Sequence, residues 1–445
     1  MKILLLMPEA NINKISLFGF RVSLREAPLT LTTLAALIPG DINAECTLID
    51  ESIEKVPHNK TFDLVAISCM TGTAVRAYYW ADYFKARGTT VVIGGIHATL
   101  CPGEAGQHAD SIVTGFAELV WKELIYDFMA GNLQSQYTGG RGDFSKLPKP
   151  RRKLQRRLGY TIPYTVTATR GCGNKCGFCA VQAADFGWST RAVGEVIDDI
   201  RKIPNKRFTF SDVNLLHDRE YALELLAAIA PLNKIWGGLA MLATAEDEEL
   251  LEALQKSGCQ YLLCGFESVT SSSLSTISKP NKVSHYSNNM KAFHAHGISI
   301  QGCFIFGLDA DRKDVFKQTV DLVNEIKIDI PRYALCTPYP GTKIFQTMEK
   351  ENRLLHKNWK HYDTQHVVIQ PKHMSPQELD KGFIWAYRET FKLKNIQNRM
   401  KESPHPLVSG VGNLAYRLYL RKLSRDKIRI IEPTSWKNAL NFSQQ

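Results

Sequence analysis

Three cysteines within eight residues, Cys172, Cys176 and Cys179, carry the strongest chemical signal in this 445-residue sequence. They follow an uncharged, β-branched segment, residues 164–169, which predicts a buried strand leading into a glycine-containing loop. Thiolates are soft ligands that suit zinc or iron–sulfur clusters. Structural zinc needs four protein ligands, but the next histidine is only His217. The triplet therefore predicts an iron–sulfur cluster with one iron open to a further ligand.

Core cysteines and an incomplete disulfide set are the plainer interpretations of the triplet. Three cysteines cannot all pair with one another in disulfides, and a cytosolic chain does not keep disulfides. Close spacing on a glycine-rich loop after a strand is also unlike ordinary core cysteines. The cluster is the favoured interpretation.

Length and composition predict an ordinary globular protein of two to three domains. Hydrophobic residues make up 44% of the chain and charged residues 22%. Residues 1–8 are too short for a signal peptide, and no run of 18 apolar residues occurs. We therefore expect a cytoplasmic protein.

The net charge of +11 is concentrated in two segments. Residues 146–158 contain seven Lys or Arg and no acid, and residues 391–445 contain eleven Lys or Arg against three acids. Basic segments can contact nucleic acid, anionic lipid or an acidic substrate. We expect the first segment to be a solvated linker, whereas the tail is either solvated or in contact with an anionic surface.

The first 138 residues alternate apolar strands with helices, which predicts a Rossmann-like domain built on a parallel, doubly wound sheet. Such sheets bind ligands at the carboxyl ends of their strands. Small and polar residues stand at those ends and are the candidate ligand contacts of this domain: Ser68, Thr71, Gly94, Gly95, His97, Gly115 and Glu118.

A second βα series starts after a basic linker at residues 139–160 and extends over residues 161–345. The expected strands are 164–169, 207–212, 235–240, 261–267, 298–308 and 330–336. Six βα units predict a partial (β/α)6 barrel of the TIM type, with its chemistry at the carboxyl ends of the strands. Residues 346–445 lose this rhythm and predict a mostly helical, basic C-terminal region.

The cysteine triplet, with the aromatic Phe178 before its last member, resembles the signature of radical S-adenosylmethionine (SAM) enzymes. The resemblance implies a [4Fe–4S] cluster on the three cysteines. It also implies reductive cleavage of SAM to a 5′-deoxyadenosyl radical that modifies an unactivated carbon. The candidate SAM contacts are Phe178, Ser211, Asp212, Glu267, Ser268 and Gly307, of which Asp212 and Glu267 match the family's SAM-binding positions in kind. For each of these strand-end residues, a loop or capping role is the plainer interpretation.

The N-terminal part resembles the cobalamin-binding domain that precedes many radical SAM barrels. The similar pieces include LVAISCMT, VVIGGIHATLCPGEAGQHAD and VTGFAELVW. The D-x-H-x-x-G run that supplies a histidine to cobalt in other cobalamin folds is absent, so the resemblance implies cobalamin without a protein ligand. A Rossmann-like scaffold that binds no cobalamin is the alternative.

These resemblances imply a C-methyltransferase that uses SAM both as methyl source and as radical source. One alternative is cyclisation, oxidation or rearrangement without methyl transfer, as in the related anaerobic magnesium-protoporphyrin ester cyclases. Another is a methylthiotransferase, which would need a second cluster on Cys46, Cys69 and Cys101. The C-terminal region resembles that of hopanoid-tailoring radical SAM proteins.

The expected partners are a small-molecule or lipid-like substrate and a reductant such as flavodoxin or ferredoxin, and nucleic acid is not expected. Residues 413–423 predict a basic amphipathic helix, in which Tyr416, Leu420 and Leu423 share an apolar face. Such helices lie on anionic membranes, which would make the cytoplasmic protein membrane-associated. The alternative is a helix that packs on the barrel.

Overall fold

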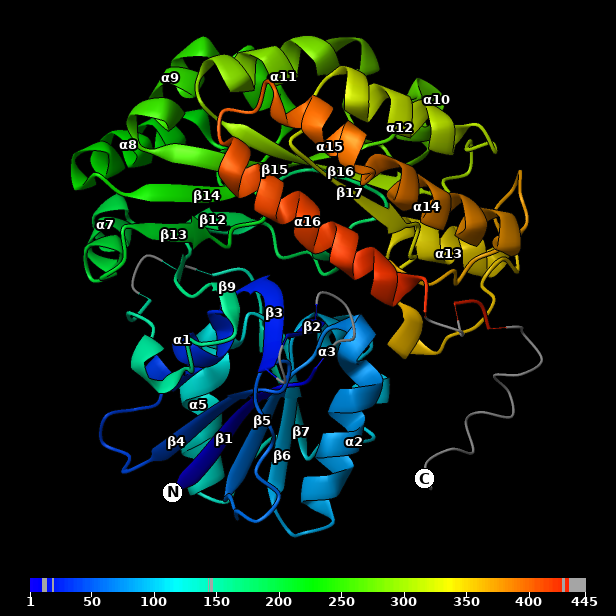
Figure 1. The fold of residues 1–445 in the computed structure, drawn as a ribbon. Helices are drawn as coiled ribbons and strands as arrows, with labels where there is room; N and C mark the ends of the chain where they lie inside the picture. Colours follow the sequence, from blue (N-terminus) through cyan, green and yellow to red (C-terminus); the bar gives the residue numbers. More distant parts are fainter. Residues whose placement is uncertain (10–13, 18–19, 143, 145–146, 426–428, 432–445) are drawn as a thin grey trace. The chain divides into compact units, whose positions relative to one another are not determined.

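The computed structural model of the protein describes residues 1–9, 14–17, 20–142, 144, 147–425 and 429–431 (Figure 1). The chain divides into two compact units. Unit 1 comprises Met1–Gly173, Cys179–Ser211 and Tyr339–Thr342, and unit 2 comprises Asn174–Phe178, Asp212–Pro338 and Lys343–Gln445. The functional domain boundaries expected near residues 138, 160 and 345 stay predictions.

Unit 1 contains a parallel six-stranded sheet in the order β4-β1-β5-β6-β7-β8. Its strands are β1 (Lys2–Met7), β4 (Glu45–Asp50), β5 (Leu64–Ser68), β6 (Thr90–Gly94), β7 (Ser111–Gly115) and β8 (Gln136–Gly139). Ser68 at the end of β5 pairs with Gly94 at the end of β6, so these carboxyl ends meet at one edge. The predicted doubly wound sheet is confirmed.

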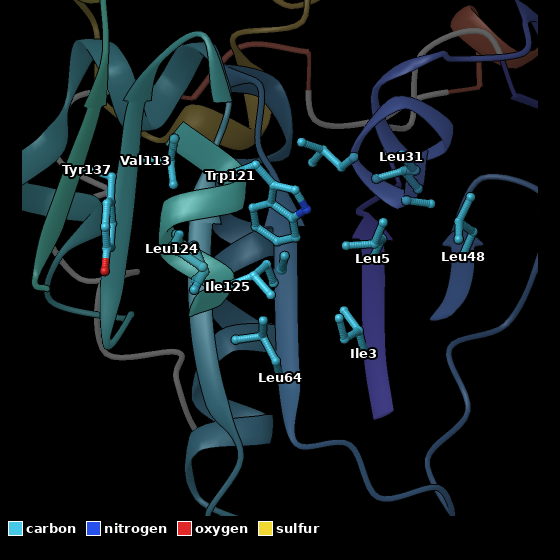
Figure 2. Close-up of a cluster of buried hydrophobic side chains, with 14 residues drawn as sticks. Ile3, Leu5, Leu31, Leu48, Leu64, Val113, Trp121, Leu124, Ile125 and Tyr137 are labelled. Atoms are coloured by element: carbon cyan, nitrogen blue, oxygen red, sulfur yellow. The ribbon is translucent and has the colours of Figure 1, made fainter. Parts of the chain in front are cut away.

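One face of this sheet is covered by helices α1 (Thr30–Ala36) and α5 (Ala117–Met129), and the buried side chains between them form one cluster (Figure 2). Trp121 and Leu124 of α5 pack in this cluster with Leu31 of α1. The strands contribute alternate residues, such as Ile3 and Leu5 of β1, because successive side chains of a strand point to opposite faces.

The other face of the same sheet is covered by helix α2 (Ala74–Lys85), which contacts β5 and β6 (Figure 1). Leu4 and Leu6 of β1, which alternate with Ile3 and Leu5, are fully buried on this second face. Trp80 and Phe84 of α2 are buried as well. Strands that are buried on both faces need continuous apolar runs. The sequence KILLLM has this property.

The second six-stranded sheet has the order β10-β13-β14-β15-β16-β17, and its measured pairs are all parallel. β10 (Thr165–Val166) and β13 (Arg207–Phe210) belong to unit 1. The other four strands belong to unit 2: β14 (Ile235–Ala240), β15 (Cys259–Glu267), β16 (Ser299–Phe306) and β17 (Ile330–Leu335). Together with the helices between its strands, this sheet confirms the predicted partial barrel.

The helices of this second series follow the predicted amphipathic segments. They are α7 (Val193–Arg201), α8 (Arg219–Ile229), α9 (Glu248–Lys256), α11 (Tyr286–Ala295) and α12 (Val315–Glu325). In unit 2, the outward face of the strands packs on these helices. Phe266 lies edge-on to Tyr286 of α11 at 4.8 Å, and Phe306 lies 4.9 Å from Phe316 of α12.

Two expected strands have different ends in the structure. The strand expected over 164–169 is wrong, because β10 pairs with β13 whereas β11 (Thr169–Gly171) pairs antiparallel with β12 (Trp188–Thr190). The apolar run therefore changes partners midway. The strand expected over 298–308 is shorter, since β16 covers Ser299–Phe306. In the first sheet, β6 ends at Gly94, and Gly95 at φ +97° turns the chain into helix α3 (Ile96–Leu100).

The C-terminal region is helical, as predicted, with α13 (Lys343–Lys350), α14 (Pro376–Thr390), α15 (Leu393–Met400) and α16 (Pro406–Leu423). Ser375 and Glu378 form a reciprocal capping box at the start of α14. Pro406 opens α16 at the first helical position. Proline suits that position, because its missing N–H would have no partner there.

The face of α16 that was expected to contact a membrane packs inside unit 2. Leu423 is buried, and the Tyr416 ring stacks on Phe391 at 5.5 Å. Leu414 and Leu418 are the exposed apolar residues instead. Among the described residues, no helix has the length and apolar character to cross a bilayer. Membrane contact stays a prediction, but the apolar face proposed for it is not available because it packs inside unit 2.

The basic linker is not simply solvated. Arg152 forms two hydrogen bonds with the buried carboxylate of Asp199 in α7, at 2.6 and 2.9 Å, and a third with the carbonyl of Thr165. Lys149 lies 3.3 Å from Asp198. The expectation of a solvated linker is wrong for Arg152, because helix α7 offers acidic partners that are distant in sequence.

Replacing Leu124 with Ala should destabilise unit 1 by about 2–5 kcal/mol, because it leaves a cavity in the cluster of Figure 2. Met129→Ala on the same helix is the control, since Met129 is 54% exposed and its loss should cost under about 0.5 kcal/mol. Denaturant unfolding followed by circular dichroism measures both. Equal effects would contradict the assigned core.

Candidate functional site

The cysteine loop runs from the end of β11 to helix α6 (Ala180–Ala183) and is fixed by its backbone. Gly171 has φ +77°, and a Cβ there would lie 2.0 Å from the carbonyl oxygen of Gly187. The N–H of Cys172 donates to that same oxygen at 2.8 Å, and Gln182 donates to the carbonyl of Cys172. Only glycine fits position 171, so the loop starts in one defined direction.

The middle of the loop belongs to unit 2 and is fixed there in a similar way. The N–H of Gly177 donates to the carbonyl of Ile277 at 3.1 Å, and the carbonyl of Gly177 accepts from Ile344 at 3.2 Å. Cys176, the residue before Gly177, is buried. Phe178, the expected adenine neighbour, is half-buried at the end of this segment.

The three thiols fit an iron–sulfur cluster in chemistry and in setting. All ten cysteines of the chain lie in its described part, and none is in a disulfide. Cys172 and Cys179 are half-buried, so the loop shields its sulfur atoms without enclosing them completely. Sulfur ligands on a backbone-anchored loop suit a cluster that must reach both a cosubstrate and a reductant.

The carboxyl end of β15 holds a buried ion pair. Glu267 Oε1 lies 2.8 Å from Lys279 Nζ, and both side chains are less than one-tenth exposed. Burial alone would lower the pKa of Lys279, but the charge and hydrogen bond of Glu267 outweigh it and raise that pKa. Glu267 has φ +65° and follows a register shift, so the backbone is strained to aim this carboxylate.

Two side chains fix the same strand end by binding its carbonyl groups. Tyr286 donates from its hydroxyl to the carbonyls of Phe266 and Ser268, at 2.8 and 3.0 Å. Asn281 donates to the carbonyls of Gly265 and Phe266. The predicted SAM contacts Glu267 and Ser268 are therefore adjacent on a rigid turn.

The other predicted SAM contacts lie at separate strand ends. Ser211 follows β13 in unit 1 and binds the Thr167 hydroxyl at 3.0 Å, whereas the buried Asp212 begins a segment of unit 2. Gly307 has φ +92°, and a Cβ there would meet Leu379 of α14 at 2.9 Å. Helix packing thus accounts for this glycine without a ligand.

Asp311 organises the turn after β16. It accepts hydrogen bonds from the backbone N–H groups of Gly307 and Leu308 and from the hydroxyl of Ser273. Burial raises the pKa of Asp311 to about 6, although these hydrogen bonds oppose the shift. The predicted residue Gly307 is held by this carboxylate.

His97, a predicted cobalamin contact, is fully buried in unit 1. Its Nδ1 lies 3.3 Å from the hydroxyl of Thr71 and its Nε2 lies 3.1 Å from the hydroxyl of Tyr78. Two predicted contacts, Thr71 and His97, are thus bound to each other. Both ring nitrogens are engaged, which does not suit a ligand of cobalt.

The predicted glycines at the edge of the first sheet serve close backbone packing. A Cβ on Gly95 would lie 2.6 Å from the carbonyl oxygen of Cys69, and a Cβ on Gly115 would lie 1.8 Å from that of Gly139. The ends of β5 and β6, and of β7 and β8, could not approach otherwise. Ser68 and Gly94 pair at this edge and are half-buried.

Glu118, in the first turn of α5, forms an ion pair with Arg170. Their side-chain atoms are 2.5 Å apart, and both side chains are mostly buried. Arg170 lies on β11, two residues before Cys172. The predicted cobalamin contact Glu118 is therefore linked to the start of the cysteine loop.

The three N-terminal cysteines do not share one site. Cys46 and Leu64 both pair with Ile3, so Cys46 is level with the start of β5. Cys69 lies five residues beyond Leu64, about 16 Å further along the strand direction. A second cluster on Cys46, Cys69 and Cys101 is excluded by this register.

Sequence reasoning missed the partners of the predicted acids. Lys279 and Arg170 neutralise Glu267 and Glu118. A buried carboxylate needs a cation or several hydrogen bonds, so the existence of such partners could have been expected. Their positions could not, because no periodic pattern marks a residue that is 52 positions away, as Arg170 is from Glu118.

Known proteins match this arrangement. Residues 166–323 match the family model of the radical SAM superfamily. Over 418 residues the chain is 33% identical to the bacteriochlorophyllide d C-12(1)-methyltransferase of Chlorobaculum tepidum, with 89% of each chain covered. The chain belongs to the radical SAM superfamily. Membership makes this protein a radical SAM enzyme and implies a [4Fe–4S] cluster and SAM.

Two further comparisons cover most of the chain, one with a protein of similar sequence and one with a protein of similar fold. This radical SAM enzyme is 27% identical to the bacteriochlorophyllide d C-8(2)-methyltransferase of the same organism, with 88% of this chain and 91% of the relative covered. The structure of OxsB, a cobalamin-dependent SAM radical enzyme, matches 99% of this chain and 74% of its own chain, with a TM-score of 0.65 and 13% identity. The similarity to the OxsB structure confirms the predicted fold class.

Replacing Cys176 with Ala in this radical SAM enzyme should prevent cluster assembly, because a three-cysteine site loses one whole ligand. Iron and sulfide content after anaerobic reconstitution should fall to background. Cys46→Ala is the matched control and should keep the full iron content, since Cys46 lies on β4. A Cys176→Ala protein with full iron and normal SAM cleavage would contradict the assignment.

Proposed function

We propose that this protein is a cobalamin-dependent radical SAM C-methyltransferase that acts on an unactivated carbon of a tetrapyrrole. The observation that carries the proposal is the 33% identity to a bacteriochlorophyllide methyltransferase across 89% of both chains. Similarity over nearly the full length covers the substrate-binding parts as well as the barrel. We take Cys172, Cys176 and Cys179 as the cluster ligands.

The chain's own residues support the binding of SAM at the carboxyl end of the barrel strands. A reduced cluster supplies the electron that cleaves SAM to a 5′-deoxyadenosyl radical. Glu267 and Ser268 lie on the turn fixed by Tyr286, and Asp212 is a buried carboxylate at another strand end. We infer that these acids and Ser268 orient the amino and ribose groups of SAM, whereas Phe178 lies beside the adenine.

The first 138 residues are proposed as the cobalamin domain, followed by a basic linker, the barrel over 161–345 and a helical region. Ser68, Gly94 and Gly115 are small, half-buried residues at the carboxyl ends of β5, β6 and β7, where parallel sheets of this kind bind ligands. We infer that cobalamin contacts this edge near Ser68, Gly94 and Gly115. Bound cobalamin supplies a transferable methyl group.

Methyl transfer is preferred to the alternatives. A methylthiotransferase would need a second cluster, and the register of β1, β4 and β5 separates Cys46 from Cys69. Cyclisation or rearrangement uses the same cluster and remains the second candidate. Reduction by a flavodoxin or ferredoxin is part of the proposal, as is a cytoplasmic location.

The test is an anaerobic incubation of reconstituted enzyme with bacteriochlorophyllide d, hydroxocobalamin, a reductant and SAM that carries a deuterated methyl group. The expected product contains one labelled methyl group, detected by mass spectrometry together with 5′-deoxyadenosine. A product that loses hydrogen without gaining the label would favour cyclisation or oxidation. The Cys176→Ala protein is the control and should give neither compound.

Cobalamin should bind without a histidine ligand, because the ring nitrogens of His97 are held by Thr71 and Tyr78. The electron paramagnetic resonance spectrum of cob(II)alamin on the enzyme reports this directly. Labelling all histidines with ¹⁵N should leave its nitrogen splitting unchanged. A changed splitting would show a histidine on cobalt, and failure of the apoprotein to bind any cobalamin would count against the cobalamin domain.

A further inference from the structure

Arg332 on β17 is a charged side chain without a counter-ion in the described part of the chain. The side chain of Arg332 forms no hydrogen bond and no ion pair with any described residue. Other buried or half-buried arginines of unit 2 have oxygen partners. Arg353 binds Asp309 at 2.9 Å, and Arg429 binds Asp380 at 2.6 Å. The buried Arg399 has three oxygen partners, at 2.6 to 2.9 Å.

The strand register places Arg332 on the inner face of the barrel sheet. Its neighbour Tyr333 is buried on the opposite, outward face, against Phe306 and Tyr387. Arg332 pairs with Cys303, which in turn pairs with Gly265. These residues form one row across β15, β16 and β17, and Arg332 is about 10 Å from Gly265.

The same row holds the Glu267–Lys279 ion pair. A Cβ on Gly265 would lie 2.2 Å from Glu267 Oε1 and 3.0 Å from Lys279 Nζ, so the pair folds back over this glycine. Lys279 is therefore already neutralised. Arg332 is the charge in this row that has no carboxylate in the described structure.

The groups whose charges act most on Arg332 are phenols and one thiol, Tyr387, Tyr416, Tyr419 and Cys303. Tyr416 of α16 accepts a hydrogen bond from the amide of Gln301 at 2.9 Å, and Tyr261 and Tyr419 are further neighbours on this side. Burial raises the pKa of all three phenols, so they stay protonated. Burial raises the pKa of Cys303 to about 11, although Arg332 opposes the shift. Among the described residues, no carboxylate forms an ion pair with Arg332.

Arg332 is half-buried and its guanidinium has no ion-pair partner in the described structure, so it can bind an anionic ligand without first breaking an ion pair. A cation–π contact is the structural alternative, as for Arg399 over Phe391 at 5.7 Å, but the pairs found among the described residues do not include Arg332. The planar guanidinium is matched to carboxylate by two parallel hydrogen bonds. The flanking phenol and amide groups can donate to the same anion.

We propose that Arg332 binds a carboxylate of the substrate on the inner face of the barrel, with Tyr416 and Gln301 as neighbouring donors. The inference rests on the proposed function and specifies its substrate as a tetrapyrrole acid rather than a tetrapyrrole ester. A carboxylate at Arg332 lies three residues before the carboxyl end of β17, about 10 Å below that edge. A macrocycle can span this depth, which leaves its far side near the strand ends.

The test is binding of chlorophyllide a, a tetrapyrrole acid, and of its methyl ester to the reconstituted enzyme, followed by fluorescence quenching. The wild type should bind the acid about 10- to 100-fold more tightly than the ester, which is the effect of one charge-assisted pair. Arg332→Met should remove this preference, and Arg332→Lys should retain part of it. Arg421→Met is the control, because Arg421 is exposed on α16, and it should bind like the wild type.

Equal binding of acid and ester by the wild type would overturn the proposal without any variant. A preference that survives in Arg332→Met would overturn it as well. Iron content and SAM cleavage without substrate show whether the variant is folded, and Tyr416→Phe gives a second variant with a smaller expected loss. Methyl transfer without a preference for the acid would support the proposed function and refute the role of Arg332 in binding a carboxylate. A preference for the acid without methyl transfer would support that role and refute the proposed function.

Discussion

The backbone contact between Gly171 and Gly187 is the constraint on which the cysteine loop depends. The carbonyl of Gly187 accepts the N–H of Cys172, and no side chain fits between the two glycines. The thiols must be presented before any metal is bound, so their direction comes from the backbone rather than from one another. The Glu118–Arg170 pair then ties the strand before this loop to the first helical turn of α5. The loop is thereby anchored on both sides of its first cysteine.

The two parallel sheets could be predicted because their strands are short apolar runs separated by helical segments. β14 was predicted to the residue, and β17 to within one residue. The segment after Tyr164 could not be predicted as two strands, since its composition is uniformly β-branched and only the partners differ. Similarly, proline breaks the interior of a helix, but its fixed φ suits the first helical turn, where Pro406 opens α16. The local composition of a segment predicts whether it forms a strand or a helix, but it does not predict which strand it pairs with.

The candidate site could be predicted where spacing itself carries the chemistry, as for the three cysteines. The strand-end acids were located correctly, but their present partners were not visible. Lys279 binds Glu267 from a loop 12 residues away, and Arg152 binds Asp199 from 47 residues away. The glycines were attributed to ligand approach, whereas Gly95, Gly115 and Gly307 are each required by a neighbouring strand or helix. Contacts between distant residues arise from the three-dimensional register, which has no counterpart in sequence spacing.

The contrast between compensated and uncompensated charges has a further physical meaning. The Glu267–Lys279 pair and the Arg353–Asp309 pair are complete within the chain, so a ligand would have to break them to use them. Breaking a buried pair costs several kcal/mol, roughly 3–5. These groups therefore act best as fixed dipoles that orient a neighbouring ligand. A cation that lacks such a partner can bind an anion without that cost, and the free energy of binding is then available to position the carbon that reacts. We therefore expect the substrate to be recognised by side chains whose charge has no counter-ion in the chain. Ion pairs that are complete within the chain are expected to orient a bound ligand.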